Sequence, residues 1–303
     1  MTLVEFFTDH TFMMVSLGTA IIGLISGALG TYTYVRKQAL AADVIAHSAL
    51  PGTMAAFLIS VLVLGIDGRT MPVLIIGALV FGGGAMWLTD FFTRVSKVNM
   101  DAAMAIVLAS LFGLGLLLMN HISRGDYPGK GGIKDYLFGN AATLTRADLV
   151  TLILVAGAAG VIVALLWKEF LVQAFDPRFA QTIGLKAWFI DGAMFTTITL
   201  AVVMGTKAVG LVLMVAFLIT PPVIARQFVD RLWSMMLLAG LIGAGTGMLG
   251  SYISVQLGKV PTGPIIVLLL FVEFVLALLI SPRRSVLRQL QLRRKYRAEV
   301  LSK

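Results

Sequence analysis

The chain of 303 residues alternates between long apolar runs and short polar breaks. About 20 apolar residues are what an α-helix needs to cross the hydrocarbon core of a bilayer. The apolar runs between breaks predict nine candidate spans, at 12–34, 42–64, 72–92, 101–120, 148–167, 188–204, 208–225, 233–256 and 263–281. The pattern therefore predicts an all-α, polytopic membrane protein.

The sixth and seventh spans differ from the others because both are short and only the tripeptide GTK (205–207) separates them. One of the two is expected to be a half-helix, which leaves eight full crossings; if both cross, there are nine. No long polar stretch divides the spans. Residues 1–284 are therefore predicted to form one transmembrane domain, followed by a basic tail at 285–303.

Composition agrees with a membrane protein, because 58% of the residues are hydrophobic and only 13% are charged. A soluble domain needs many more polar positions to cover its surface. The chain has no cysteine, which excludes disulfides, thiolate metal ligands and cysteine nucleophiles. Its net charge of +9 does not predict a nucleic-acid partner, since basic residues of membrane proteins gather in cytoplasmic loops.

The distribution of Lys and Arg predicts the orientation of the chain. One set of loops, together with the C-terminal tail, holds 17 of the 24 basic residues, and the opposite set holds seven. Without the eight basic residues of the tail, the split is nine to seven in the same direction. The positive-inside rule then places the N-terminus outside and the C-terminus in the cytoplasm.

Two polar residues interrupt the second apolar run near its start. Asp43 and His47 are four residues apart and project from one face of a helix. His47 lies about 15 Å along the helix from Lys37, near the middle of the membrane. A charge there costs on the order of 3 kcal/mol, so such residues face a partner or a cavity. Pro51 cannot donate a hydrogen bond to the carbonyl of His47, which leaves that oxygen free on the same turn.

This set of donors has three interpretations. A carboxylate, an imidazole and a free carbonyl suit Mn, Fe or Zn and are a poor set for Cu(I). A proton relay and a purely structural Asp–His hydrogen bond stay open on the same spacing. Two side chains are too few for a stable metal site, but a pore between two similar subunits would double them.

Other candidate residues point to structural roles. Glu273 is the other acid deep in an apolar run, and we expect it to form an interhelical hydrogen bond. Asp90, Asp101 and Asp191 lie at span ends, where acids are tolerated or cap helices. The sequence has no P-loop, HExxH or GxSxG motif. The chain is therefore not expected to be an enzyme or to hydrolyse ATP.

Six stretches resemble, in order, the signatures of the ABC-type permeases for manganese, zinc and iron: VRKQALAADVIAHSALPG, DAAMAIVLASLFGLGLLL, YLFGNAATLTRADL, FDPRFAQTIGL, AVGLVLMVAFLITPPVIARQF and VPTGPIIVL. The match runs from about Arg36 to Arg284 and is most similar to the manganese-type branch. The resemblance implies a type II ABC importer-like fold. It also implies Mn²⁺, Zn²⁺ or Fe²⁺ as cargo, with no permanently bound cofactor.

The resemblance further implies partners and a location. These are a cytoplasmic ABC ATPase that binds ATP, a second homologous permease or another copy of this chain, and an extracytoplasmic metal-binding lipoprotein or periplasmic protein. The location would be the bacterial cytoplasmic (inner) membrane. In this family the acid and histidine of the second span contact the metal in transit, which corresponds to Asp43 and His47. Ala42 stands where the family commonly has Gly.

Two cytoplasmic segments are expected to contact the ATPase. The principal one is 221–232, which is similar to the coupling segment of the vitamin-B12-type importers and offers Arg226, Asp230 and Arg231. The supporting one is 175–185, which offers Asp176 and Arg178. In it, Pro177 is expected to start a helix after Asp176 and Gly184 to end it.

The competing function is a proton-coupled secondary metal transporter. Asp43 and His47 would then form a proton relay, and transport would need neither ATP nor a partner ATPase.

Overall fold

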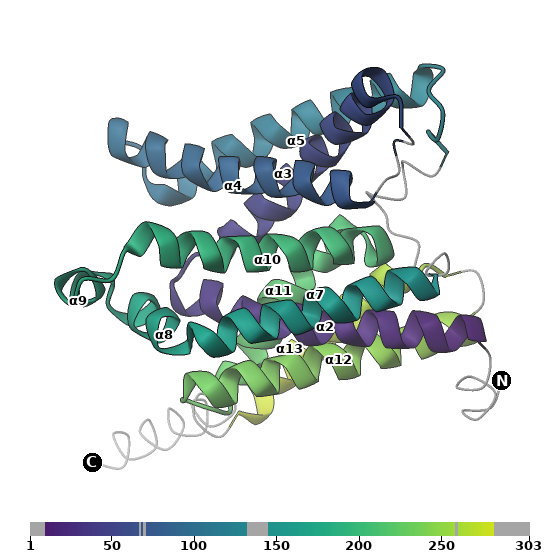
Figure 1. The fold of residues 1–303 in the computed structure, drawn as a ribbon. Helices are drawn as coiled ribbons and strands as arrows, with labels where there is room; N and C mark the ends of the chain where they lie inside the picture. The colour runs from purple at the N-terminus through teal and green to yellow at the C-terminus, as the bar shows by residue number, and fades with distance from the viewer. Residues whose placement is uncertain (1–9, 67, 69–70, 132–144, 258–259, 282–303) are drawn as a thin grey trace, which may run out of the picture.

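The computed structural model describes residues 10–66, 68, 71–131, 145–257 and 260–281. Within these residues the chain is helical and has no strand (Figure 1). The elements are α2 (His10–Val35), α3 (Ala39–Ile59), the π-helix η1 (Ser60–Leu64), α4 (Met71–Val95), α5 (Met100–Arg124), α7 (Arg146–Leu165), α8 (Trp167–Phe175), α9 (Pro177–Thr182), α10 (Ala187–Val209), α11 (Leu211–Arg226), α12 (Leu232–Leu257) and α13 (Thr262–Ile280). The tail predicted at 285–303 lies outside the described residues.

The predicted all-α membrane fold is confirmed. Eight of the described helices are long and apolar enough to cross a bilayer. The seventh predicted span is the short one, because α11 has 16 residues and a full crossing takes about 20. Several side chains of α11, including Leu213, Met214 and Phe217, are almost completely buried. A helix enclosed by protein does not need the length that a lipid-facing helix needs.

The predicted break at GTK is wrong. Helix α10 continues through these residues, and the hydroxyl of Thr206 donates to the carbonyl of Val202 within the helix. The chain turns at Gly210 instead, where φ is 82°. Glycine adopts this left-handed region without the steric penalty of a side chain, so the turn falls there.

The helices form two groups on either side of α10 (Figure 1). Helices α3, α4 and α5 pack on one another above α10 in this view, whereas α2, α7, α11, α12 and α13 lie at its level or below it. Helix α10 contacts members of both groups, including α3, α4, α2 and α7. The short helices α8 and α9 lie at the left end of the bundle.

Glycine residues allow α2 and α12 to pack closely against each other. Gly23 lies against Gly243, and Gly27 lies against the carbonyl of Ala239, so that a Cβ on either α2 glycine would overlap backbone atoms of α12. Without a hydrophobic driving force in lipid, helices associate through such close backbone packing. The small residues of both helices therefore make this contact.

We expect Gly243→Ala to lower the stability of the protein and Gly245→Ala not to lower it. A Cβ at Gly243 would overlap the backbone of Gly23, whereas nothing lies within 4 Å of one at Gly245. Gly243→Ala should destabilise by at least the ~1–3 kcal/mol of overpacking, because backbone cannot move aside as a side chain can. Gly245→Ala should be neutral or gain up to ~1 kcal/mol of helix propensity. Thermal unfolding of the purified protein tests this, and equal shifts would contradict it.

Candidate functional site

Helix α3 carries the two polar residues that the sequence singles out. From Ala41 to Met54 every residue is buried except Asp43 and His47. Their side chains are 26% and 20% exposed, respectively. Because they are four residues apart, they form one accessible stripe on an otherwise enclosed helix. A purely structural pair would be expected to be as buried as its neighbours.

Asp43 and His47 are in direct contact. His47 Nε2 lies 3.0 Å from Asp43 Oδ1. Two ligand atoms that each lie about 2.1 Å from one metal ion, at a right angle, are separated by about 3.0 Å. The two atoms therefore have the spacing of adjacent ligands of one ion as well as that of a hydrogen bond.

Packing holds the imidazole of His47 in place. The ring of Phe112, on α5, meets it edge-on with ring centroids 4.6 Å apart. His47 Nδ1 is buried and has no hydrogen-bond partner within the described part of the chain. The histidine therefore has an uncommitted nitrogen and an orientation fixed by an apolar neighbour. Fixed orientation reduces the conformational entropy lost when a ligand binds.

The residues that flank the accessible stripe on α3 differ in exposure. Leu40, one turn before Asp43, is exposed, whereas Pro51, one turn after His47, is buried. Pro51 packs against α5, where a Cβ on Gly115 would come 2.9 Å from the proline Cδ. Access to the pair therefore opens along α3 towards the α2–α3 corner. Proline leaves the carbonyl of His47 without its helical donor, at the Pro51 end of the stripe.

One chain supplies only part of a metal site. The described residues contain no group of three or more His, Cys, Asp or Glu side chains that could hold an ion. Stable metal sites in proteins have about four or more ligands. Asp43 and His47 alone would therefore not suffice to hold an ion.

The expectation for Glu273 is confirmed. Both of its carboxylate oxygens, on α13, lie within 2.9 Å of the hydroxyl of Thr246 on α12. Among the described residues, it does not belong to any group of three or more His, Cys, Asp or Glu side chains that could hold an ion. Glu273 thus joins two neighbouring helices.

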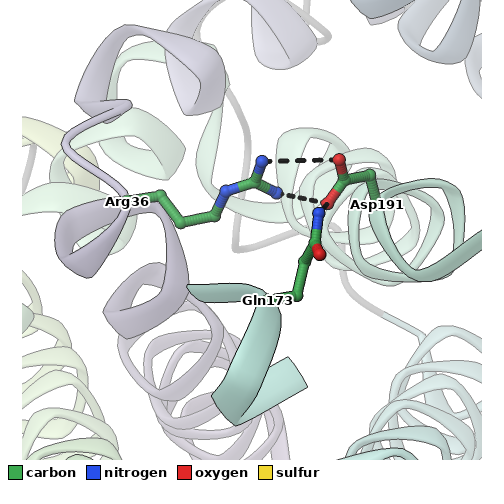
Figure 2. A network of polar contacts seen from close by, with 3 residues as sticks. All are labelled: Arg36, Gln173 and Asp191. Atoms are coloured by element: carbon green, nitrogen blue, oxygen red, sulfur yellow. Dashed lines mark hydrogen bonds and ion pairs between the residues drawn. The ribbon is translucent and has the colours of Figure 1, made fainter. Parts of the chain in front are cut away.

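Asp191 has a role that the sequence does not reveal. It was expected to be a span-end acid, but it pairs with Arg36, with 2.6 Å between Asp191 Oδ1 and Arg36 Nη1 (Figure 2). Gln173 Nε2 donates to the same oxygen over 3.1 Å. The two charged residues are 155 positions apart in the chain. From the sequence, Arg36 contributes only to the prediction of membrane orientation, as one of the basic residues on the cytoplasmic side. No local pattern could have paired Arg36 with Asp191.

The two predicted coupling segments differ in structure. Segment 175–185 contains α9, and the Asp176 side chain caps it by accepting hydrogen bonds from the amides of Arg178 and Phe179. Gly184 follows the helix with a φ of 81°, which confirms the predicted start and stop. Figure 1 shows α9 extending beyond the neighbouring helices.

Segment 221–232 is not a separate helix. It comprises the end of α11 and the turn that leads into α12. Arg226 Nη1 donates to the carbonyl of Asp230 over 2.7 Å and so closes this turn. Trp233, at the start of α12, packs edge-on against Trp167, at the start of α8, with ring centroids 5.5 Å apart. Both segments therefore lie at the same end of the bundle.

A family comparison decides what kind of protein this is. Residues 8–281 match the model of the ABC 3 transport family. The chain belongs to this family. Among its relatives, the zinc transport system membrane protein TroC of Treponema pallidum is 34% identical over 97% of this chain and 96% of its own. The manganese transport system membrane protein MntC of Bacillus subtilis is 35% identical over 92% of this chain and 63% of its own.

A solved structure supports the fold of this ABC 3 family member. The chain is similar to PsaBC from Streptococcus pneumoniae in complex with Fab, with a TM-score of 0.82 and 28% sequence identity. The match covers 96% of this chain and all of the other. The predicted family and the ABC permease fold are therefore confirmed. The chain is a multi-pass membrane permease subunit.

We expect Thr246→Val to destabilise the permease by about 1–3 kcal/mol, because the Glu273 carboxyl then lacks its partner within the membrane. Thr246→Ser keeps the hydroxyl and should be close to neutral. Glu273→Gln retains a group that can hydrogen-bond to Thr246, so it should leave metal uptake unchanged. Unfolding in detergent measures the first two variants, and metal accumulation in cells measures the third. Loss of uptake in Glu273→Gln would place Glu273 on the transport pathway.

Proposed function

We propose that this chain is the membrane subunit of an ABC importer for divalent transition metal ions, with Mn²⁺ as the first candidate and Zn²⁺ or Fe²⁺ as alternatives. The observation that carries the proposal is the Asp43–His47 pair, which forms the accessible stripe of a buried helix in a member of the ABC 3 transport family. Relatives named for manganese and for zinc support the cargo class. One carboxylate and one imidazole suit all three ions.

The transported ion would bind between the two side chains. Asp43 Oδ1 and His47 Nε2 would each ligate it, in place of the direct contact that they now make over 3.0 Å. The aspartate would neutralise one of its two positive charges. This contact offsets part of the cost of removing water from the ion at mid-membrane depth.

The proposed assembly contains more than this chain. A second permease, identical or homologous, would supply another Asp–His pair, so that four side-chain ligands meet in the central pathway. A cytoplasmic ATPase would bind and hydrolyse ATP, and an extracytoplasmic metal-binding protein would deliver the ion. The chain would lie in the bacterial cytoplasmic membrane with its C-terminus inside. ATP-driven closure of the ATPases would rock the two permeases around the central site.

Both coupling segments would contact the ATPase. Helix α9 offers Asp176 and Arg178, and the α11–α12 turn offers Arg226, Asp230 and Arg231. The projection of α9 beyond its neighbours supports a larger role for it than the sequence suggests. Because α9 is capped by Asp176 at its start and ended by Gly184, it is a stiff element that can transmit a displacement.

One observation favours the competing function. The direct contact between Asp43 and His47, 3.0 Å apart, is also what a proton relay requires. In that case this chain alone, in liposomes with a pH gradient, would carry metal without ATP, and an uncoupler would abolish uptake. The ABC proposal requires uptake only when the ATPase is present and ATP is supplied.

We expect Asp43→Ala and His47→Ala each to abolish metal uptake without preventing assembly with the ATPase. Loss of a direct ligand should weaken binding by more than the ~10–100-fold that outer-shell partners contribute. The matched control is Ser48→Ala, since Ser48 is adjacent but buried on another side of α3. Uptake of ⁵⁴Mn and ⁶⁵Zn by cells, with co-purification of the ATPase, measures both effects. Normal uptake in either variant would refute the site.

A second prediction concerns the α11–α12 turn. Combining Arg226→Ala with Asp230→Ala removes its proposed contacts and its internal hydrogen bond. ATP hydrolysis should then persist while metal transport falls. Arg124→Ala is the control, because Arg124 ends α5 at the opposite end of the bundle. Proteoliposome uptake and phosphate release, assayed together, give the ratio of ions to ATP, and an unchanged ratio would remove the turn from the coupling mechanism.

A further inference from the structure

Three side chains from different elements meet at the end of the bundle that holds α8 and α9. Figure 2 shows the guanidinium of Arg36, after the end of α2, facing the carboxylate of Asp191 on α10. Arg36 Nη1 lies 2.6 Å from Asp191 Oδ1, and Arg36 Nη2 lies 3.4 Å from Oδ2. Gln173, on α8, donates from Nε2 to Asp191 Oδ1 over 3.1 Å. We call these three residues the brace.

The brace is partly removed from water. The Arg36 side chain is 11% exposed and that of Asp191 is 28% exposed, and Gln173 is buried. The guanidinium also lies 5.8 Å from the ring centroid of Phe195. A charge pair at this depth is stronger than a surface pair, and its loss leaves an uncompensated charge in the protein. The brace therefore fixes its three elements relative to one another.

Arg36 belongs to a tight corner that leads directly into the helix of the candidate metal site. The amide of Gln38 donates to the carbonyl of Thr33 over 2.9 Å, and Lys37 has a φ of 57°. This is a Schellman-type helix end with a residue other than glycine in the left-handed position. Helix α3 begins immediately afterwards, and Asp43 lies in its second turn. Because the corner is short and closed, a displacement of Arg36 moves the start of α3.

Gln173 belongs to the arm that carries the proposed ATPase contact. Helix α8 ends at Phe175, and Asp176 then caps α9. A second contact fixes this arm to α2, because the rings of Phe170 and Tyr32 meet edge-on with centroids 5.4 Å apart. Both rings are almost fully buried. The α8–α9 arm is therefore attached to α10 by the polar contact of Gln173 with Asp191, and to the C-terminal part of α2 by the aromatic contact of Phe170 with Tyr32.

We propose that Arg36, Asp191 and Gln173 are positioning residues that make the α8–α9 arm, the α2–α3 corner and the start of α10 move as one body. A displacement imposed on α9 then reaches Asp43 and His47 without loss. This inference rests on the proposed function, since it assumes that α9 receives the push of an ATPase. The brace would then transmit the displacement of α9 to the proposed metal site.

The first test removes one contact at a time in the complex with its ATPase, reconstituted in liposomes. Asp191→Asn should lower metal uptake per ATP about tenfold, within the range typical of coupling between sites. Gln173→Leu should lower it less, because the ion pair and the Phe170–Tyr32 contact remain and only the hydrogen bond between α8 and α10 is lost. Metal binding at Asp43 and His47 and the amount of assembled complex should be unchanged in both. A variant affected only in folding would lose assembled complex and keep the ratio.

The matched control is the ion pair between Arg94 and Asp90, which lie 2.8 Å apart on α4. These residues and the brace pair line the same cavity of about 360 Å³. Because Arg94 and Asp90 belong to one helix, breaking their pair frees no element from another. Arg94→Gln should therefore leave uptake per ATP unchanged. If Arg94→Gln lowered uptake per ATP as much as Asp191→Asn does, any charged residue at this cavity would affect coupling. The proposed role of the brace would then be wrong.

The second test replaces the ion pair by a covalent link. The natural chain has no cysteine, so Arg36→Cys with Asp191→Cys creates the sole thiol pair, and the cavity gives reagents access to it. A short bis-methanethiosulfonate should restore uptake per ATP in this variant, and reduction should abolish it again. Failure of the bridge to restore uptake, or complete arrest by it, would show that the contact must open during the cycle and would overturn the brace.

Failure of the proposed function has a different signature from failure of the brace. If the unaltered complex neither binds nor imports metal, the proposed function is wrong, whatever the brace variants do. If the unaltered complex imports metal and the brace variants import equally per ATP, the brace alone is wrong.

Discussion

The absence of water inside a bilayer is the constraint on which this structure depends. Every charged or polar side chain within a span must find a partner there or face a hydrated passage. Glu273 finds its partner in Thr246 on the next helix. Arg36 and Asp191 neutralise each other at the end of the bundle. Asp43 and His47 bind each other but remain accessible, and His47 retains an unpaired nitrogen. Of these three pairs in the described part of the chain, this last one combines accessibility with an unpaired donor atom, so it retains the capacity to bind something else.

Helix packing explains why the pair can be accessible on so buried a helix. The glycine contacts between α2 and α12 draw one group of helices tightly together, and α3 packs against α4 and α5 in the other group. Gly52 on α3 and Gly77 on α4 approach so closely that a Cβ on either would overlap the backbone. With that face of α3 occupied, Asp43 and His47 are left on the remaining one. Their exposure is thus a consequence of where glycine allows close approach.

The short helices connect this packing to the proposed energy source. Helix α9 extends from the bundle, and α8 is attached to α2 through Phe170 and Tyr32. The α2–α3 corner then joins that attachment to α3, which carries Asp43 and His47, within a few residues. A permease that passes an ion through a central site needs a stiff link between its cytoplasmic surface and that site. The brace residues lie where such a link is required.

The sequence by itself determined the membrane class, the nine helical segments and the Asp43–His47 face, because each follows from local periodicity and from the transfer cost of charge into lipid. It also predicted α9, through Asp176, Pro177 and Gly184, and the contact of Glu273 with a neighbouring helix. The prediction placed the break between α10 and α11 at GTK (205–207), whereas the chain turns at Gly210. Hydropathy does not show which of these residues leaves the helical conformation. Only the tertiary structure decided that Arg36 meets Asp191 and Gln173, and which face of α3 stays accessible. These contacts join residues far apart in the chain, and their energies come from packing geometry, which no local pattern encodes.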